Sequence, residues 1–162
     1  MHTSPFHLRA LQPGDMGWVI HRQMVLYAQE YGWNNEFEAL VAEIGARFIR
    51  EFDPAGECAW IAEHEGQVVG AVFVVRHDAT TAKLRMLYVE AQTRGMGLGS
   101  RLVDECMAFA RGTGYTRMVL WTNSVLVDAR RIYERAGFEL LEEEPHHSFG
   151  QDLIGQVWGR AL

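Results

Sequence analysis

The stretch VEAQTRGMGLGSRLV, residues 89–103, joins an apolar run typical of a strand to a run with the residue spacing of a helix. Three glycines stand at alternate positions directly after Arg94. Because glycine has no Cβ, its backbone can approach a ligand closely. The first turn of a helix also carries unpaired N–H groups and a partial positive charge. The stretch therefore predicts a loop that binds an anion such as a diphosphate, with a charge-assisted contact from Arg94.

Two familiar nucleotide-binding loops do not fit this stretch. It lacks the Lys-Ser/Thr ending of a P-loop, so we do not expect hydrolysis of ATP or GTP. A Rossmann loop would follow the first strand of a βαβ unit, whereas this stretch follows strands of antiparallel character late in the chain. Composition alone leaves one alternative open, a strand-to-helix turn that merely tolerates glycine.

The segments on both sides of the loop alternate between the periods of helices and strands. Helices are predicted over residues 15–31, 36–52, 97–111 and 125–136, and strands over 6–11, 58–64, 67–77, 82–89, 117–123, 138–144 and 153–161. The pair Glu65-Gly66 predicts a hairpin turn between two of the strands. We therefore expect an α/β or α+β fold with a mixed, mostly antiparallel sheet flanked by helices. A single domain is expected over residues 1–162.

Composition narrows the class of protein. A chain of 162 residues is long enough for one well-buried core and short for two. The formal net charge of -6 argues against a general nucleic-acid binder and suits a cationic substrate better. No apolar run approaches a membrane span, and the start MHTSPFHLRAL does not resemble a secretory signal, so we expect a cytoplasmic protein. Cys58 and Cys106 have no metal-binding spacing and are predicted to be reduced core residues.

A second motif follows about 35 residues after the glycine loop. The two motifs are Arg94-x-x-Gly97-x-Gly99 and Ala129-x-x-Ile132-Tyr133-x-x-x-Gly137-Phe138. In this order and at this separation they resemble the GNAT superfamily of N-acetyltransferases, and the similarity extends over nearly the whole chain. Residues 120–158 further resemble the acetyltransferase half of bacterial proteins that fuse a winged-helix regulator to a GNAT domain. We expect only that half here.

The resemblance implies acetyl-CoA as the cofactor. Its pyrophosphate would lie on the amides of the glycine loop, at Arg94, Gly95, Met96, Gly97, Leu98, Gly99 and Ser100. Its pantetheine arm would pair, like an added strand, with Leu87, Tyr88 and Val89. A strand edge with unpaired N–H and C=O groups can satisfy an amide-rich arm in this way.

The resemblance also implies a catalytic acid. A tyrosine at the position of Tyr133 protonates the departing thiolate in the family. The asparagine often found seven residues earlier is replaced by Leu126, which cannot hydrogen-bond to the pantetheine arm. Asn123 is a possible substitute for it. The alternative role of Tyr133 is to pack its ring against the sheet.

The group that accepts the proton of the amine is less clear from the sequence. An alkyl ammonium with a pKa near 10.4 is only roughly a thousandth deprotonated at neutral pH. The central-strand glutamate of some relatives corresponds to Lys83, which leaves Glu90, His146, His147 or a water chain. We expect a water chain assisted by Glu90. A metal site at His146 and His147 is not expected, because adjacent residues of a strand point to opposite faces.

Recognition of the acceptor amine is predicted from two segments. Tyr27, Tyr31 and Trp33 form an amphipathic wall, or else belong to the core, and Glu30 or Glu36 would attract a cation. His146 and His147 would line the same pocket. The predicted function is direct transfer of an acetyl group to a primary amine of a small molecule or peptide. The alternative is a catalytically silent acyl-CoA-binding regulatory module. The sequence leaves the assembly open, and a homodimer is one option.

Overall fold

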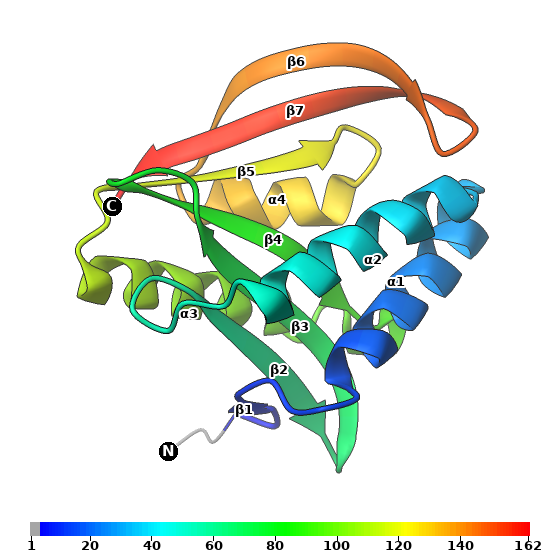
Figure 1. The fold of residues 1–162 in the computed structure, drawn as a ribbon. Helices are drawn as coiled ribbons and strands as arrows, with labels where there is room; N and C mark the ends of the chain where they lie inside the picture. The colour runs from blue at the N-terminus through cyan, green and yellow to red at the C-terminus, as the bar shows by residue number, and fades with distance from the viewer. Residues whose placement is uncertain (1–3) are drawn as a thin grey trace.

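The computed structural model describes residues 4–162, so the first three residues of MHTSPFHLRAL lie outside the described residues. Its helices are α1 (Asp15–Tyr31), α2 (Asn35–Arg50), α3 (Leu98–Thr113) and α4 (Val127–Arg135), with a short 3-10 turn, η1 (Ala91–Thr93). Its strands are β1 (His7–Arg9), β2 (Cys58–His64), β3 (Gln67–Arg76), β4 (Thr81–Val89), β5 (Arg117–Asn123), β6 (Glu139–Ser148) and β7 (Gln151–Ala161). The predicted order of elements is confirmed (Figure 1).

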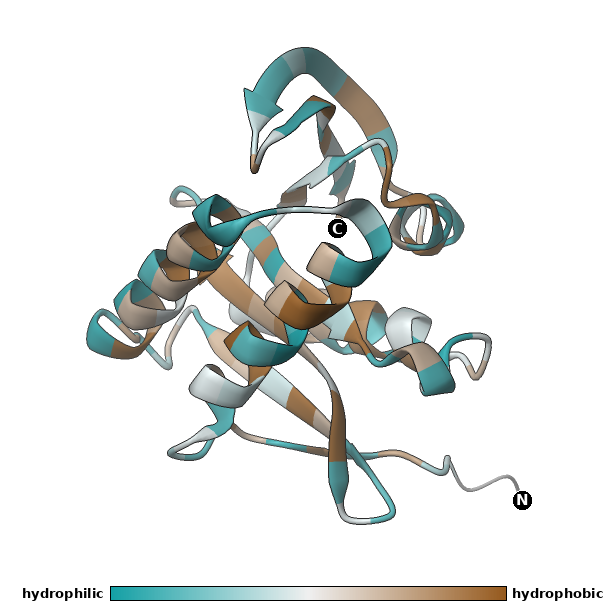
Figure 2. Cartoon of the chain, turned by 90° about the vertical axis from the view of Figure 1, so that its right-hand side faces the viewer, coloured by the Kyte–Doolittle hydropathy of each residue, from teal (hydrophilic) through white to brown (hydrophobic). Residues whose placement is uncertain are grey.

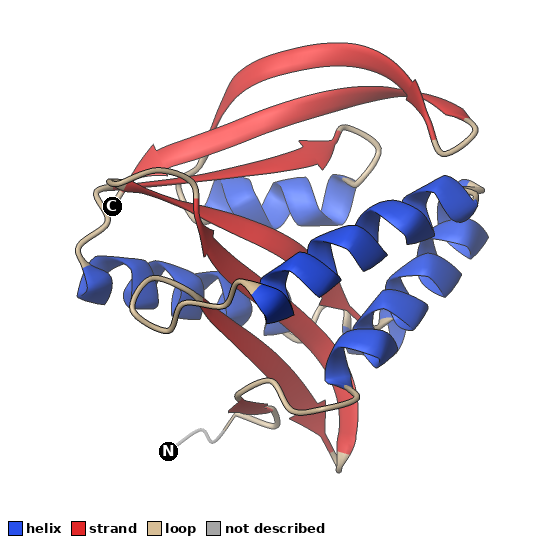
Figure 3. Ribbon diagram, viewed as in Figure 1, coloured by secondary structure: helices blue, strands red, loops and turns tan. Residues whose placement is uncertain are grey.

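All seven strands belong to one sheet, in the order β1-β2-β3-β4-β5-β7-β6. Among the strands of residues 4–162, only the neighbours β4 and β5 are parallel, and every other pair is antiparallel. The helices α1 and α2 cover one face, and α3 and α4 cover the other (Figure 3). The predicted mixed, mostly antiparallel sheet with flanking helices is therefore confirmed.

Two apolar layers hold the helices against the sheet. On the α3 side, Leu102 and Cys106 pack with Leu84 and Leu120 of the central strands. On the α1 side, Val19 packs with residues of β2, β3 and β4. Hydrophobic residues accordingly recur along the helices and the central strands, between hydrophilic ones (Figure 2). Burial of apolar surface stabilises the arrangement by roughly 25 cal/mol per Å², and it fixes which face each helix covers.

The last two strands extend further than the sequence pattern predicts. They form a long hairpin, which turns at Phe149 and Gly150, where φ is 59° and 78°. Pro145 lies within β6 at the outer edge of the sheet, where the missing N–H leaves no ladder bond broken. The segment EEPHHSFG is therefore mostly strand, because tertiary pairing outweighs its polar composition.

The sheet opens between β4 and β5. These strands pair only over Thr81–Leu84 and Arg117–Leu120, and beyond that point they diverge (Figure 1). Met86 has a φ of 55°, and the register between β3 and β4 shifts beside it, which marks a β-bulge. The bulge bends β4 away from β5, so the end of β4 keeps one edge without a strand partner.

No helix within residues 4–162 is long and apolar enough to cross a membrane.

Candidate active site

A cavity of about 420 Å³ lies where β4 leaves β5. It is enclosed by the end of α1, the end of β4, the glycine loop with the start of α3, and α4. Its lining residues are Leu26, Tyr27, Tyr31, Leu87, Tyr88, Val89, Thr93, Arg94, Gly95, Gly97, Leu98, Gly99, Ser100, Leu126, Asp128, Ala129, Arg131, Ile132 and Arg135. Nearly all of the predicted cofactor-binding residues therefore border one space. Met96 projects from the loop into solvent, and Asn123 lies elsewhere.

The glycine loop has the geometry of an anion site. Gly95 and Gly97 both have a φ of 80°, which other residues adopt only with strain, and a Cβ at either would meet nothing within 4 Å. The open space beside these two residues leaves their backbone accessible. Gly99 has a different role, because a Cβ there would lie 2.4 Å from Cδ1 of Ile132. Its lack of a side chain lets α3 and α4 pack closely.

The start of α3 offers unpaired donors to this space. Within residues 4–162, the N–H groups of Gly97, Leu98, Gly99 and Ser100 donate to no backbone carbonyl. These groups lie at the positive end of the helix dipole. The residues present therefore fit a diphosphate, the anionic group of coenzyme A.

Helix α4 adds positive charge that the sequence reasoning missed. Arg131 and Arg135 line the cavity, and Asp128 lies 4.0 Å from Nη1 of Arg131. Together with Ile132, these residues recur at three- and four-residue spacing, which places them on one face of the helix. That periodicity is the sequence signal that could have identified them.

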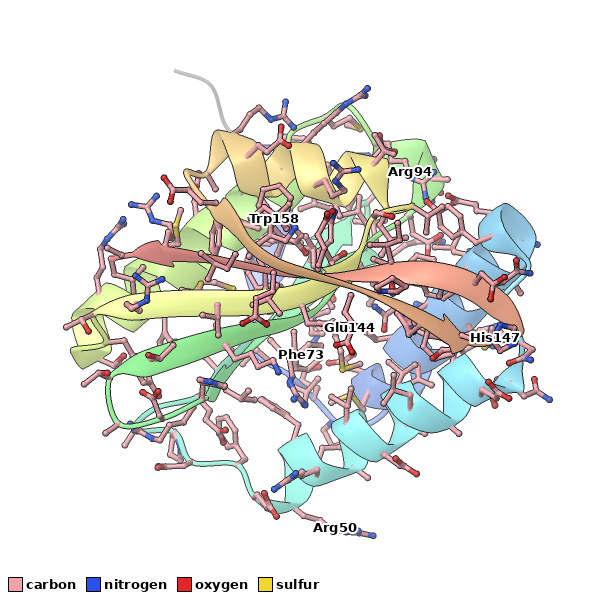
Figure 4. The ribbon with its side chains drawn as sticks, turned by 90° about the horizontal axis from the view of Figure 1, so that it is seen from above. Arg50, Phe73, Arg94, Glu144, His147 and Trp158 are labelled. Atoms are coloured by element: carbon pink, nitrogen blue, oxygen red, sulfur yellow. The ribbon has the colours of Figure 1, made fainter. Side chains whose placement is uncertain are left out.

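Arg94 does not lie free in the cavity. Its Nη2 donates to Oε1 of Glu30 on α1, and this hydrogen bond raises the pKa of the guanidinium. The ion pair connects the glycine loop to α1 across the cavity; Figure 4 shows Arg94 at this position. Glu30 itself does not line the cavity, and an anion bound at the loop would meet Arg94 already paired with this carboxylate.

Tyr133 of α4 is buried beside the cavity. Its ring packs against Phe138 at 6.0 Å between centroids, and only 5% of the residue is exposed. Burial raises the pKa of the hydroxyl, and the nearby Tyr27 and Cys106 raise it further. The hydroxyl thus stays protonated at neutral pH. Tyr27 and Ile132 line the cavity, whereas Tyr133 itself is not among the lining residues.

Glu90 belongs to a buried polar network at the end of β4. Nε and Nη2 of Arg22 donate to its two oxygens at 2.7 and 2.8 Å, and the Tyr88 hydroxyl donates to Oε2. Burial alone would raise the pKa of this carboxyl, but the hydrogen bonds from Arg22 and Tyr88 and the charge of Arg22 outweigh it and lower the pKa. Glu90 is therefore an anion whose oxygens are already engaged.

The two histidines of β6 point to opposite faces, as expected for neighbours in a strand. Nε2 of His146 lies 2.8 Å from Oδ1 of the buried Asn123, and its ring lies 5.6 Å from that of Trp121. His147 is exposed and lies 2.8 Å from Oδ1 of Asp152. Neither histidine borders the cavity, and Asn123 faces His146 instead of the cofactor side.

The aromatic residues of the α1–α2 segment divide into two groups. Tyr27 and Tyr31 line the cavity. Trp33 is 3% exposed and packs against Phe149 at 4.9 Å between centroids, so it belongs to the core. Glu36 accepts a hydrogen bond from the N–H of Phe149 at 2.9 Å and does not face the cavity. These contacts attach the β6–β7 hairpin to the α1–α2 turn.

Among the described residues, no group of three or more His, Cys, Asp or Glu side chains is placed to hold a metal ion.

Comparison with known proteins agrees with this geometry. A family model described as the acetyltransferase (GNAT) family matches residues 20–138. N-acetylaspartate synthetase of Danio rerio is 36% identical over 104 residues, which are 64% of this chain and 36% of that protein. Human N-acetyltransferase 8B is 35% identical over 112 residues, which are 66% of this chain and 45% of that protein. The chain thus spans less than half the length of these two relatives.

Solved structures share the fold at lower sequence identity. The Salmonella typhimurium protein yncA, solved with its cofactor acetyl-CoA, superposes with a TM-score of 0.71 at 20% identity. The match covers 97% of this chain and 94% of that one. Because the family model matches well over half of the sequence, the chain belongs to the acetyltransferase (GNAT) family.

Proposed function

We propose that the protein uses acetyl-CoA to acetylate a primary amine of a small molecule or peptide. The observation that carries this proposal is the position of one cavity. It lies between four free N–H groups at the start of α3 and the unpartnered edge of β4. The first feature suits a diphosphate and the second suits an amide-rich arm. In coenzyme A, the amide-rich arm is attached directly to the diphosphate.

The cofactor, when bound, supplies an acetyl group as a thioester. The backbone of Leu87, Tyr88 and Val89 would orient the arm along β4, and the free amides of residues 97–100 would hold the phosphates. The amides of Arg94 and Met96, which the sequence also placed in this group, already donate to Ala91 and Thr93. The apolar lining on α4, from Ala129 and Ile132, excludes water from the arm. The acceptor amine would replace the thiolate directly in a ternary complex. The Tyr133 hydroxyl would donate the proton that the thiolate takes up, for which it must reach the cavity that its neighbour Ile132 lines.

The proton of the amine leaves by water in this proposal. Glu90 assists as a fixed negative charge near the end of β4, since its lowered pKa makes it a weak base. His146 and His147 stay candidates for lining the acceptor side, with Tyr27, Tyr31 and Trp33. Trp33 would act through its neighbours, because it packs in the core.

The experiment is a panel of primary amines assayed for CoA release with a thiol reagent. Initial rates at several concentrations of both substrates should give intersecting lines, as direct transfer requires, and parallel lines would indicate a covalent acetyl-enzyme. If no amine in the panel causes release of CoA although acetyl-CoA binds tightly, the result would favour the silent regulatory module. Two features favour that alternative. Leu126 lines the cavity where the family often has asparagine, and Lys83 stands in place of the central-strand glutamate of some relatives.

Assembly and location are proposed from the sequence. We propose a cytoplasmic protein that acts without nucleic acid, consistent with its net charge of -6 and its free thiols at Cys58 and Cys106. A single domain over residues 1–162 is supported by the one sheet that crosses the described chain. The homodimer and the relationship to winged-helix regulator fusions stay predictions. Light scattering tests the first, and copurification with a winged-helix protein tests the second.

A further inference from the structure

A second cavity, of about 200 Å³, lies on the opposite face of β4 from α3. It is bounded by the second half of α2 and by β3 and β4, and Phe73 forms part of its apolar floor. Arg47, Arg76 and Arg85 reach it from three different elements. Glu51 and Glu57 also line it, so its positively charged groups exceed its carboxylates by one.

Two of its arginines already have partners. Nε of Arg47 donates to Glu51 at 3.0 Å, and the guanidinium of Arg76 lies 5.1 Å from the centre of the Tyr115 ring. Arg85 is different. Although it is half-buried, no carboxylate within residues 4–162 lies within 4.0 Å of its side-chain nitrogens.

Lys83, two residues earlier on β4, is a second cation in the same kind of surroundings. It is also half-buried and, within the same residues, without an ion pair. Residues two apart in a strand share a face, so Lys83 and Arg85 lie on the side of the sheet away from α3. Burial and the mutual repulsion of these cations lower the pKa of Lys83. Two half-buried cations without a counter-ion carry an uncompensated desolvation cost, which a bound anion would remove.

The bulge at Met86 separates this cavity from the cofactor cavity. Met86 lines the second cavity, whereas its neighbour Leu87 lines the first. Arg85 and Leu87 flank Met86, so the two cavities border the same three-residue stretch of β4. A small molecule whose amine reaches the cofactor arm at Leu87 could therefore place an anionic group against Arg85.

We propose that Arg85 binds a carboxylate of the acceptor, so that the acceptor is an amino acid. This inference rests on the proposed acetyltransferase function and names the substrate class of the same site. A guanidinium matches a carboxylate through two parallel hydrogen bonds, which an ammonium cannot reproduce. Lys83 adds charge beside it, and the apolar floor at Phe73 and Met86 excludes water from the pair.

The experiment compares matched acceptors in the variant Arg85→Gln. Free amino acids and their carboxamides are assayed at equal concentrations of free amine, so that only the carboxylate differs. The wild type should prefer the amino acids at least tenfold in kcat/KM. Arg85→Gln should lower kcat/KM for them by about 10- to 100-fold, mainly through KM, as expected for a lost hydrogen bond between charged groups. It should change kcat/KM for the carboxamides and KM for acetyl-CoA less than twofold.

Two further variants separate binding from folding. Arg50→Gln removes an exposed arginine at the end of α2, whose side chain points away from the protein (Figure 4), and should behave like the wild type. Arg85→Lys keeps the charge without the paired hydrogen bonds and should fall between Arg85→Gln and the wild type. Thermal unfolding of each variant shows whether it folds.

The inference is wrong if the wild type prefers the carboxamides, or if Arg85→Gln lowers kcat/KM equally for both kinds of acceptor. Binding of glutarate, a dicarboxylate without an amine, gives a readout independent of turnover. Calorimetric titration of the CoA-saturated protein should detect it, with at least tenfold weaker binding in Arg85→Gln. If no amine is acetylated but glutarate binds through Arg85, the proposed function fails and the anion site stands. Absence of glutarate binding to the wild type overturns the site itself.

Discussion

The sharpest test of the cofactor site is the substitution Gly97→Val. The residue immediately precedes α3, has a φ of 80°, and leaves its Cβ position open, so valine meets no protein atom there. The cost to folding is therefore backbone strain alone, about 1–3 kcal/mol. The side chain would instead occupy the approach to the free N–H groups of α3. Loss of two hydrogen bonds to a charged phosphate, each about 1.5–3 kcal/mol, corresponds to a loss in acetyl-CoA affinity of roughly 10²-fold or more.

Gly14 provides a matched control, because it precedes α1 in the same way. Its φ is 94°, and its Cβ position is also open. Helix α1 reaches the cofactor cavity only from Leu26 onward, roughly 18 Å from Gly14 at 1.5 Å per residue. Gly14→Val should therefore lose similar stability in thermal unfolding and keep its acetyl-CoA affinity in calorimetric titration. Unchanged affinity in folded Gly97→Val, or an equal loss in Gly14→Val, would refute the assignment of the loop.

Four further outcomes are expected. Tyr133→Phe should lower kcat by about 10²-fold with little change in acetyl-CoA affinity; equal losses in binding and turnover would indicate that the ring only packs. Arg22→Gln should destabilise the fold by about 2–4 kcal/mol in chemical denaturation, because it leaves the buried Glu90 unpaired. Since the folded pKa of Glu90 is depressed, its stabilisation is present above the unfolded pKa and is lost as pH falls through the folded pKa. Glu90→Gln should therefore weaken the acid dependence of the unfolding free energy, and an unchanged acid limb would contradict the ion pair. Neither Glu90→Gln nor His146→Asn should remove a limb from the pH profile of kcat/KM. This profile should rise with the free-amine fraction. A loss of kcat/KM beyond about 10²-fold in His146→Asn, with folding and cofactor binding intact, would place the proton path at β6.

Local patterns in the sequence predicted most of the fold. Helical and strand periods depend on neighbours within a few residues, so the element order and the strand–glycine loop–helix junction were recognisable. The site at that junction was predictable for the same reason. Free amides at the start of a helix belong to one short segment, and α3 presents them to the cavity.

Contacts between distant segments depended on the tertiary structure. Arg22 and Glu90 are 68 residues apart in the chain. Because they form an ion pair, Glu90, a candidate general base, is a hydrogen-bonded carboxylate. The contact of His146 with Asn123 and the burial of Trp33 against Phe149 have the same origin. A side chain's neighbours across a sheet are set by strand order and register, which no local period encodes.

The divergence of β4 and β5 shows most clearly which features local sequence determines and which depend on tertiary contacts. The sequence by itself determined that a strand ends in a glycine-rich loop at the start of a helix, because glycine spacing and helix termini act over a few residues. Only the tertiary structure decided that this strand separates from its neighbour at Leu84, bends at Met86 and carries Arg85 on the face away from α3. The physical reason is that both cavities form between elements far apart in the chain, so their shape and charge arise only after packing has brought those elements together.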